Sequence, residues 1–199
     1  MKAFVLAEPG KVKWFDAPEP QLVPYGAILK PVAVTPCSSD VHTVFGGGSK
    51  KQDNLVLGHE CIAEVVSVGE NVCDFKTGDR VAVPAITPDW REKSIQEGND
   101  RHASAPFSGH QLGRTQPGVF SERFLIKDAD TTLAHIPQKI SEEQALMSVD
   151  VVTTGFTGAE YADIKIGDTV CVIGIGPIGL MAVAGAKLRG AARIIAVGT

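Results

Sequence analysis

A thiol, an imidazole and two carboxyl groups stand out in this sequence as a possible metal-binding set. Cys37 precedes the tripeptide Gly58-His59-Glu60, and Asp150 follows much later in the chain. Thiolate, imidazole and carboxylate ligands together suit a four-coordinate zinc ion, and three protein ligands leave one position for water or substrate. We therefore hypothesise a catalytic zinc site built from segments that are far apart in the sequence.

A second chemical motif lies near the end of the sequence. Residues 174–179 read Gly-Ile-Gly-Pro-Ile-Gly, which matches the GxGxxG pattern of dinucleotide-binding turns. In this pattern Gly174 makes the tight turn, Gly176 lets the backbone approach a pyrophosphate, and Gly179 lets helix and strand pack closely. The free N–H groups and positive dipole end of the following helix then hold the phosphates. The predicted cofactor-binding residues are Gly174, Ile175, Gly176, Pro177, Ile178, Gly179, Gly198 and Thr199.

The residues after the glycine motif indicate which nicotinamide cofactor is preferred. In NAD-binding proteins a carboxylate about 20 residues further on accepts a hydrogen bond from the ribose 2′-hydroxyl. At that point this chain has Val197-Gly198-Thr199 and no acidic residue. Because no carboxylate would repel a 2′-phosphate, the sequence favours NADP(H).

Composition and charge exclude several classes of function. The chain has 199 residues, of which 44% are hydrophobic, so we expect a globular protein with a buried core. Its net charge is −4 and it contains no run of like charges, which argues against a nucleic-acid partner. The apolar residues 1–7 are interrupted at Glu8-Pro9-Gly10, and no later run approaches the roughly 20 apolar residues of a membrane span. We expect a cytoplasmic protein without a membrane partner.

Short strands separated by turns must position the metal-binding residues. Apolar alternation and punctuating Gly and Pro residues predict strands at 3–6, 12–15, 27–34, 62–69, 81–83 and 119–126. Thr35-Pro36 ends the third of these strands just before Cys37, and Ser38 or Ser39 is expected to cap a short helix that stops at Gly46-Gly47-Gly48. Residues 87–118 show no periodicity and predict an irregular lobe or an ordered surface loop.

The pattern changes after Pro137. The capping-box sequence Ser141-Glu142-Glu143-Gln144 predicts a helix toward Met147, with Asp150 just past its end. A second helix is predicted at 153–161. A strand at 169–173, a helix at 180–188 and a strand at 192–197 then predict a parallel βαβ unit around the glycine motif.

Taken together, these motifs resemble the zinc-dependent medium-chain alcohol dehydrogenases, in particular their bacterial NADP-dependent secondary-alcohol branch, also called isopropanol dehydrogenases. The motifs that carry the resemblance are Cys37, the helix at 39–42, Gly58-His59-Glu60, the turn at 77–81, the surroundings of Asp150 and the glycine motif. The resemblance implies a mixed α+β and α/β fold. Residues 1–150 would form a GroES-like β-barrel catalytic domain, and residues 151–199 the start of an incomplete Rossmann nucleotide-binding domain.

The resemblance also implies a ligand set. Cys37, His59 and Asp150 would bind one catalytic zinc ion, and Glu60 would be a neighbouring carboxylate that can enter the coordination shell when substrate is absent. Many relatives bind a second, structural zinc ion through four cysteines in the lobe after the barrel strands. Residues 84–118 contain no cysteine, so we expect no structural zinc here.

The same resemblance implies roles for the residues around the zinc site. Ser39 would contact the substrate hydroxyl and pass its proton toward His42 while a hydride moves to the nicotinamide. Ala85 and Ile86 match positions that line the substrate pocket. His110 lies in the region where the secondary-alcohol branch carries a tryptophan, so the pocket is expected to differ in size or polarity.

Three hypotheses about function follow. The first is a zinc-dependent oxidoreductase that transfers a hydride between NADP(H) and a small secondary alcohol or ketone, acting as a homo-oligomer, a tetramer by family resemblance, when full length. The second is a non-catalytic fragment, because an incomplete sheet exposes an edge and lacks half of the cofactor site. The third is a zinc-free relative of the quinone reductases, against which the intact ligand set argues. We expect the 199-residue chain alone to bind zinc and to turn over poorly or not at all.

Overall fold

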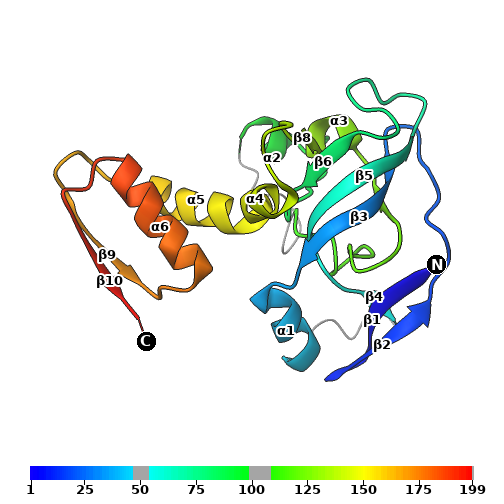
Figure 1. Cartoon of the computed structure of the whole chain (residues 1–199), viewed down its shortest axis with the longest axis horizontal. Helices are drawn as coiled ribbons and strands as arrows, with labels where there is room; N and C mark the ends of the chain where they lie inside the picture. Colours follow the sequence, from blue (N-terminus) through cyan, green and yellow to red (C-terminus); the bar gives the residue numbers. More distant parts are fainter. Residues whose placement is uncertain (47–53, 99–108, 199) are drawn as a thin grey trace. The chain divides into compact units, whose positions relative to one another are not determined.

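Two compact units make up the chain, Met1–Leu146 and Met147–Thr199 (Figure 1). The computed structural model describes residues 1–46, 54–98 and 109–198. Thr199, one of the predicted cofactor-binding residues, lies outside the described residues.

The first unit is built from two antiparallel sheets (Figure 1). One has three strands in the order β2-β1-β4, and the other has five in the order β7-β3-β5-β6-β8. The strands are β1 (Lys2–Glu8), β2 (Lys11–Asp16), β3 (Ala27–Thr35), β4 (Leu55–Val56), β5 (Glu60–Val68), β6 (Arg80–Val83), β7 (Phe124–Ile126) and β8 (Ala134–His135). The strands predicted in this part of the sequence are therefore present, with ends shifted by one or two residues, except the last.

The predicted strand at 119–126 is wrong in its first half. Only Phe124–Ile126 forms a strand, β7. The residues before it pair instead with the segment that leads into Gly58. Gly118 N–H donates to the Val56 carbonyl at 2.9 Å, and Phe120 N–H donates to the Leu57 carbonyl at 2.9 Å. The chain then turns at Ser121, whose hydroxyl donates to the Arg123 carbonyl.

The described part of the first unit contains four short helices. They are α1 (Ser38–Phe45), α2 (Lys93–Gln96), α3 (Ala129–Thr132) and α4 (Glu142–Met147), which runs to the unit boundary. The capping box predicted before α4 is present: Ser141 N–H donates to Gln144 Oε1 at 3.1 Å, and Gln144 N–H donates to Ser141 Oγ at 3.3 Å. The described part of the lobe at 87–118 is irregular apart from α2, as its lack of periodicity predicted.

The core of the first unit lies between the inward faces of its central strands. Strand β5 begins with four consecutive buried residues, because it is flanked by β3 and β6 in the sheet. The core residues with no exposed surface include Leu29, Cys61, Val65, Val81 and Val83. Burying a Leu or Val side chain contributes roughly 1.5–3 kcal/mol, so this cluster fixes the position of β5 and of the residues that precede it.

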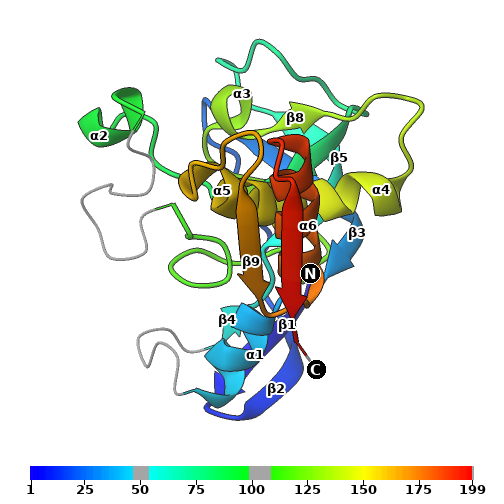
Figure 2. The same cartoon turned by 90° about the vertical axis from the view of Figure 1, so that its left-hand side faces the viewer.

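The second unit is a helical segment followed by one parallel βαβ unit. Its elements are a π-helix (Ser148–Val152), α5 (Thr153–Tyr161), β9 (Thr169–Ile173), α6 (Pro177–Leu188) and β10 (Arg193–Val197). Strands β9 and β10 pair in parallel, and Figure 2 shows them side by side with α6 against one face. Helix α6 begins three residues earlier than predicted, because proline is readily accommodated at the first helical position and its missing N–H costs nothing there.

Helices α5 and α6 pack closely through small residues. A Cβ atom at Gly155 would lie 2.5 Å from Met181 Cβ, and one at Gly185 would lie 2.9 Å from Ala159 Cβ. The strands are less covered: Ile173 is 83% exposed and Val197 is 48% exposed. The helical side of this unit is therefore packed, whereas its strands leave large apolar side chains in contact with water.

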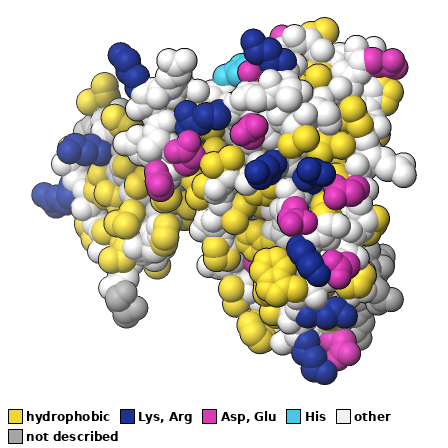
Figure 3. All heavy atoms as spheres, turned by 45° about the vertical axis from the view of Figure 1, so that its right-hand side comes forward, with side chains coloured by type: hydrophobic (Ala, Val, Ile, Leu, Met, Phe, Trp, Pro, Cys, Tyr) yellow, Lys and Arg dark blue, Asp and Glu magenta, His cyan; other side chains and the backbone are white. Residues whose placement is uncertain are grey.

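The surface carries charges of both signs. On the face that Figure 3 shows, Lys and Arg side chains are interspersed with Asp and Glu side chains. Across the described parts of the chain, no helix combines the length and the apolar character that crossing a bilayer requires.

Candidate metal centre

Three of the predicted metal ligands meet in the first unit. Cys37, His59 and Glu60 each offer a donor atom, and these atoms lie within 4.8 Å of one another. His59 and Glu60 are each only 2% exposed, and Cys37 is half-buried. A carboxylate that is removed from water is stable when it is paired with a cation or coordinates a metal. The donor types and the burial therefore fit a zinc ion.

The position of Cys37 is set by the start of helix α1. Cys37 has an extended conformation, with φ −90° and ψ 157°, and is itself the N-cap of the helix. The prediction that Ser38 or Ser39 caps this helix is therefore wrong, since both already lie inside it. The Asp40 carboxylate instead reaches back and accepts the Cys37 N–H at 2.9 Å.

Asp40 ties this helix to the segment that carries the other two donors. Its Oδ1 atom accepts the Gly58 N–H at 3.1 Å and lies 3.5 Å from Nδ1 of His59. Burial alone raises the pKa of the Asp40 carboxyl. The hydrogen bonds from His59 and the Cys37 N–H, the charge of His59 and the Gly58 N–H outweigh burial and lower that pKa below its ordinary value. The aspartate is thus an ionised acceptor held among donors.

The contact between Asp40 and His59 selects one tautomer of the imidazole. A carboxylate next to Nδ1 favours a proton on that nitrogen and leaves Nε2 to bind a metal, an arrangement typical of zinc-binding histidines. Asp40 was not among the residues singled out from the sequence. A signal for it was present, because an acidic residue three positions after a helix cap is the second half of a capping box.

Gly58 is required by the backbone geometry before His59. Its φ of +89° lies in the region that favours glycine, and a Cβ atom there would lie 2.4 Å from the Phe120 ring. The turn at Gly58 brings the side chains of His59 and Glu60 close to Cys37.

The predicted proton-relay residues lie on α1. Ser39 is half-buried, and its hydroxyl oxygen lies 3.4 Å from Nε2 of His59. His42 follows three residues later, which places it on the same side of the helix, and it is exposed to solvent. Ser39 thus lies beside the candidate metal site, and His42 is in contact with solvent.

The predicted substrate-pocket residues lie on two neighbouring segments. Ala85 is 3% exposed and Ile86 is 47% exposed, and the Thr87 N–H that follows them donates to the Gly109 carbonyl. His110 packs against a predicted metal ligand: its ring centroid is 4.6 Å from that of His59, at an interplanar angle of 66°. The structure therefore places His110 next to the candidate metal centre.

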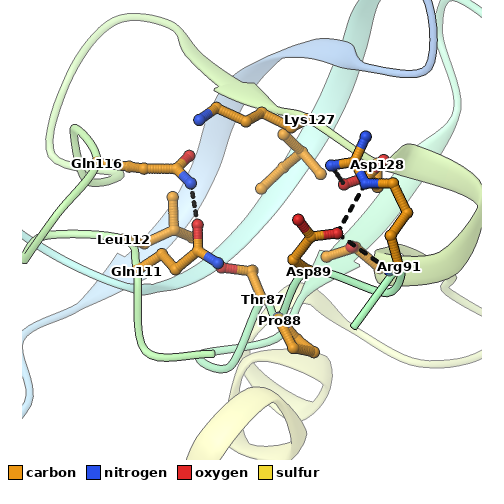
Figure 4. A pocket seen from close by; sticks show the side chains of 11 residues that line it. Thr87, Pro88, Asp89, Arg91, Gln111, Leu112, Gln116, Lys127 and Asp128 are labelled. Atoms are coloured by element: carbon orange, nitrogen blue, oxygen red, sulfur yellow. Dashed lines mark hydrogen bonds and ion pairs between the residues drawn. The ribbon is translucent and has the colours of Figure 1, made fainter. Parts of the chain in front are cut away.

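A polar cavity of about 100 Å³ lies behind these two segments (Figure 4). Arg91 bridges Asp89 at 2.8 Å and Asp128 at 3.5 Å, while the Gln116 amide donates to the Gln111 side chain. None of the predicted site residues lines the cavity. The Arg91–Asp128 pair joins the segment after Ile86 to the loop after β7, whereas the Gln111–Gln116 contact lies within the segment after His110.

Asp150, the fourth predicted ligand, belongs to the second unit. As predicted, it lies just past a helix, because α4 ends at Met147 and α5 begins at Thr153. The residues between these helices form a π-helix, which was not predicted, and Asp150 lies inside it. Such single π turns occur often at functional sites. The Asp150 carboxylate accepts a hydrogen bond from the Thr154 hydroxyl at 2.6 Å.

The glycine motif of the second unit forms a tight turn between β9 and α6. Gly174 has φ +89°, and its N–H donates to the Val197 carbonyl at 2.7 Å. A Cβ atom at Gly179 would lie 1.8 Å from the Gly174 carbonyl oxygen, so only glycine fits there. At Gly176, the N-cap of α6, an added Cβ atom would meet nothing within 4 Å. The turn therefore leaves open the position through which a phosphate would approach the helix.

Comparison with known proteins gives a consistent result. Residues 24–138, more than half of the chain, match the alcohol dehydrogenase GroES-like domain. The chain is 54% identical over its whole length to the NADP-dependent isopropanol dehydrogenase of Thermoanaerobacter brockii and 49% identical to that of Clostridium beijerinckii. It covers 56% and 57% of these proteins, so it spans about half the length of the curated relatives that it matches.

Solved structures agree with the sequence relatives. The zinc-dependent alcohol dehydrogenase 2 of Streptococcus pneumonia, in its apo form, superposes with a TM-score of 0.88 at 30% identity, covering 98% of this chain and 55% of that protein. Alcohol dehydrogenase TADH from Thermus sp. ATN1 gives the same TM-score at 28% identity and covers all of this chain. The expected GroES-like fold is confirmed, and the chain belongs to the zinc-type medium-chain alcohol dehydrogenase family.

Proposed function

We propose that this chain provides the zinc-binding and phosphate-binding parts of an oxidoreductase that moves a hydride between NADP(H) and a small secondary alcohol or ketone. The observation that carries the proposal is the buried donor set of Cys37, His59 and Glu60, with Asp40 holding the histidine. The names of the relatives, NADP-dependent isopropanol dehydrogenases, support the reaction and the cofactor.

The proposed zinc ligands are Cys37, His59 and Asp150, with Glu60 as an adjacent carboxylate. When bound, zinc supplies a Lewis acid that polarises the substrate oxygen, and the nicotinamide accepts or donates the hydride. The burial of His59 and Glu60 keeps bulk water away from their donor atoms and strengthens electrostatic interactions there. We also propose that Asp150 is the third zinc ligand and that the chain binds no second, structural zinc ion.

The chain's own residues would move the proton. The Ser39 hydroxyl, which lies 3.4 Å from Nε2 of His59, would take the proton of the substrate hydroxyl, and the exposed His42 would receive it. Ala85, Ile86 and His110 would bound the substrate. An imidazole in place of a large apolar ring makes this wall more polar.

The second unit would bind the diphosphate of the cofactor. The open position at Gly176 and the N-terminal N–H groups of α6 support this role. The preference for NADP(H) is supported by the lack of a carboxylate at residues 197–199 and by the names of the relatives. The tetrameric assembly and the cytoplasmic location implied by the resemblance stay predictions.

The test combines metal analysis with turnover. We expect one zinc ion per chain by elemental analysis, and NADPH oxidation by acetone that a chelator abolishes and added zinc restores. Zinc without NADPH binding or turnover would favour the fragment hypothesis. Turnover that persists without zinc would favour the quinone-reductase hypothesis and overturn the proposal.

A further inference from the structure

Asp150 is held by the two threonines that follow it. The Thr154 hydroxyl donates to the Asp150 carboxylate oxygen Oδ1 at 2.6 Å, and the Thr153 hydroxyl donates to the Asp150 backbone carbonyl at 2.8 Å. All three residues belong to the second unit, in the π-helix and the first turn of α5. One threonine therefore acts on the side chain of Asp150 and the other on its backbone.

The hydrogen bond from Thr154 limits the orientations of the carboxylate. A short bond to an ionised oxygen is among the stronger kinds of hydrogen bond and fixes the plane of the group that accepts it. A carboxylate has about four lone-pair sites, so accepting one hydroxyl leaves it able to ligate a metal ion. The side chain of a helical residue lies over the turn before it, which is why Thr154 reaches Asp150.

From this geometry we propose that Thr154 is a positioning residue for the metal centre: its hydroxyl orients the Asp150 carboxylate for zinc. The inference rests on the proposed function, in which Asp150 is a ligand. Carboxylate ligands of metals are commonly oriented by such outer hydrogen bonds, and losing one weakens metal binding by about 10- to 100-fold. Because Thr154 is exposed, we expect the lower end of this range.

The neighbouring threonine gives a matched control. Thr154→Val and Thr153→Val remove the same hydroxyl from adjacent positions of one helical turn, and each deletes one bond to Asp150. Only the first deletes a bond to the carboxylate. If Thr154 acts through local helix stability alone, the two variants should bind zinc alike.

The experiment measures zinc affinity of the 199-residue chain by competition with a chromophoric chelator. We expect Thr154→Val to weaken zinc binding about tenfold and Thr153→Val to change it less than about twofold. Thr154→Ser, which keeps the hydroxyl, should bind within about threefold of the original chain. The absorption bands of the Co²⁺-substituted protein should shift in Thr154→Val and not in Thr153→Val.

Asp150→Asn tests whether Asp150 is itself a zinc ligand, separately from the positioning role of Thr154. If this variant binds zinc as tightly as the original chain, Asp150 is not a ligand and the proposed function loses that part. If Asp150→Asn weakens binding but Thr154→Val does not, Asp150 remains a ligand and the positioning role of Thr154 is overturned. Equal losses in Thr154→Val and Thr153→Val would also overturn it.

Discussion

Strands β5 and β9 have similar compositions, but their surroundings differ. Each carries a cysteine that is followed by a β-branched residue, Ile62 in β5 and Val172 in β9. Cys61 and Ile62 in β5 have no exposed surface, whereas in β9 Cys171 is exposed and Ile173 is 83% exposed. Among the residues that the structure describes, β5 lies between two strands of a five-stranded sheet, whereas β9 has β10 as its one neighbouring strand, so fewer residues cover its side chains.

The two units therefore hold their proposed functional groups in place by different means. In the first unit, a buried polar network around Asp40 fixes the donor atoms, and the network depends on the packed core beneath β5. In the second unit, the phosphate-binding turn depends on backbone conformation at glycines in an open setting. Changes in the first unit should therefore affect stability and metal binding together, and changes in the turn should affect cofactor binding alone.

Thiol labelling should give the largest contrast between the two strands. Burial raises the pKa of the Cys61 thiol far above its ordinary value, and the thiolate is the form that reacts. We expect iodoacetamide to label Cys171 at least about a thousandfold faster than Cys61 in the native chain, as followed by peptide mass spectrometry. Exposed Cys73 is the control and should react like Cys171. Similar native rates for Cys61 and Cys171 would contradict the burial of β5.

Replacing Gly58 by alanine should destabilise the first unit strongly. The variant must hold a non-glycine residue at φ +89° and place a methyl group against the Phe120 ring. We expect a loss of about 3 kcal/mol or more in the free energy of unfolding, measured with urea. The control is Gly78→Ala, where φ is +90° but an added Cβ atom meets nothing within 4 Å. If the free energy of unfolding falls equally in both variants, the contact with Phe120 does not contribute to the loss of stability.

Asp40→Asn should weaken zinc binding without removing a ligand. The amide keeps the shape of the side chain but loses the charge that holds the proton on Nδ1 of His59. We expect zinc affinity to fall by about 10- to 100-fold, measured by chelator competition. Asp16→Asn changes an exposed carboxylate on β2 and should leave the affinity unchanged. Tight zinc binding in the Asp40 variant would show that His59 is oriented by other contacts.

Gly176→Ala should have the smallest effect on stability. Gly176 has φ −65°, which alanine adopts readily, and its added methyl group would have open space around it. We expect the free energy of unfolding to change by less than about 1 kcal/mol, while NADPH binding measured by fluorescence titration weakens. Unchanged NADPH binding would mean that no phosphate approaches the backbone at this position.

Much of this arrangement could be predicted from residue types and spacing. The alternation of apolar residues placed β1, β2, β3 and β5, and the glycine motif placed the turn between β9 and α6. The joint occurrence of Cys37 and Gly58-His59-Glu60 predicted three donors that the structure brings together. Each of these features can be predicted because a particular strand, turn or ligand set requires particular residue types.

Asp40 and the π-helix could not be predicted in the same way. The capping-box spacing from Cys37 indicates a role for Asp40 at the helix start, but its contacts with Gly58 and His59 come from a segment about 20 residues away and leave no local pattern. The π-helix between α4 and α5 depends on one additional residue in a helical turn, and a segment of five residues is too short to show a changed period.

The π-helix also sets the rotational position of Asp150 around the axis of the helix that follows it. One residue corresponds to about 100° around a helix axis. Deleting Val151, which lies between Asp150 and α5, would therefore turn the Asp150 side chain by about that amount relative to Gly155 and Ala159, the positions of α5 that meet α6.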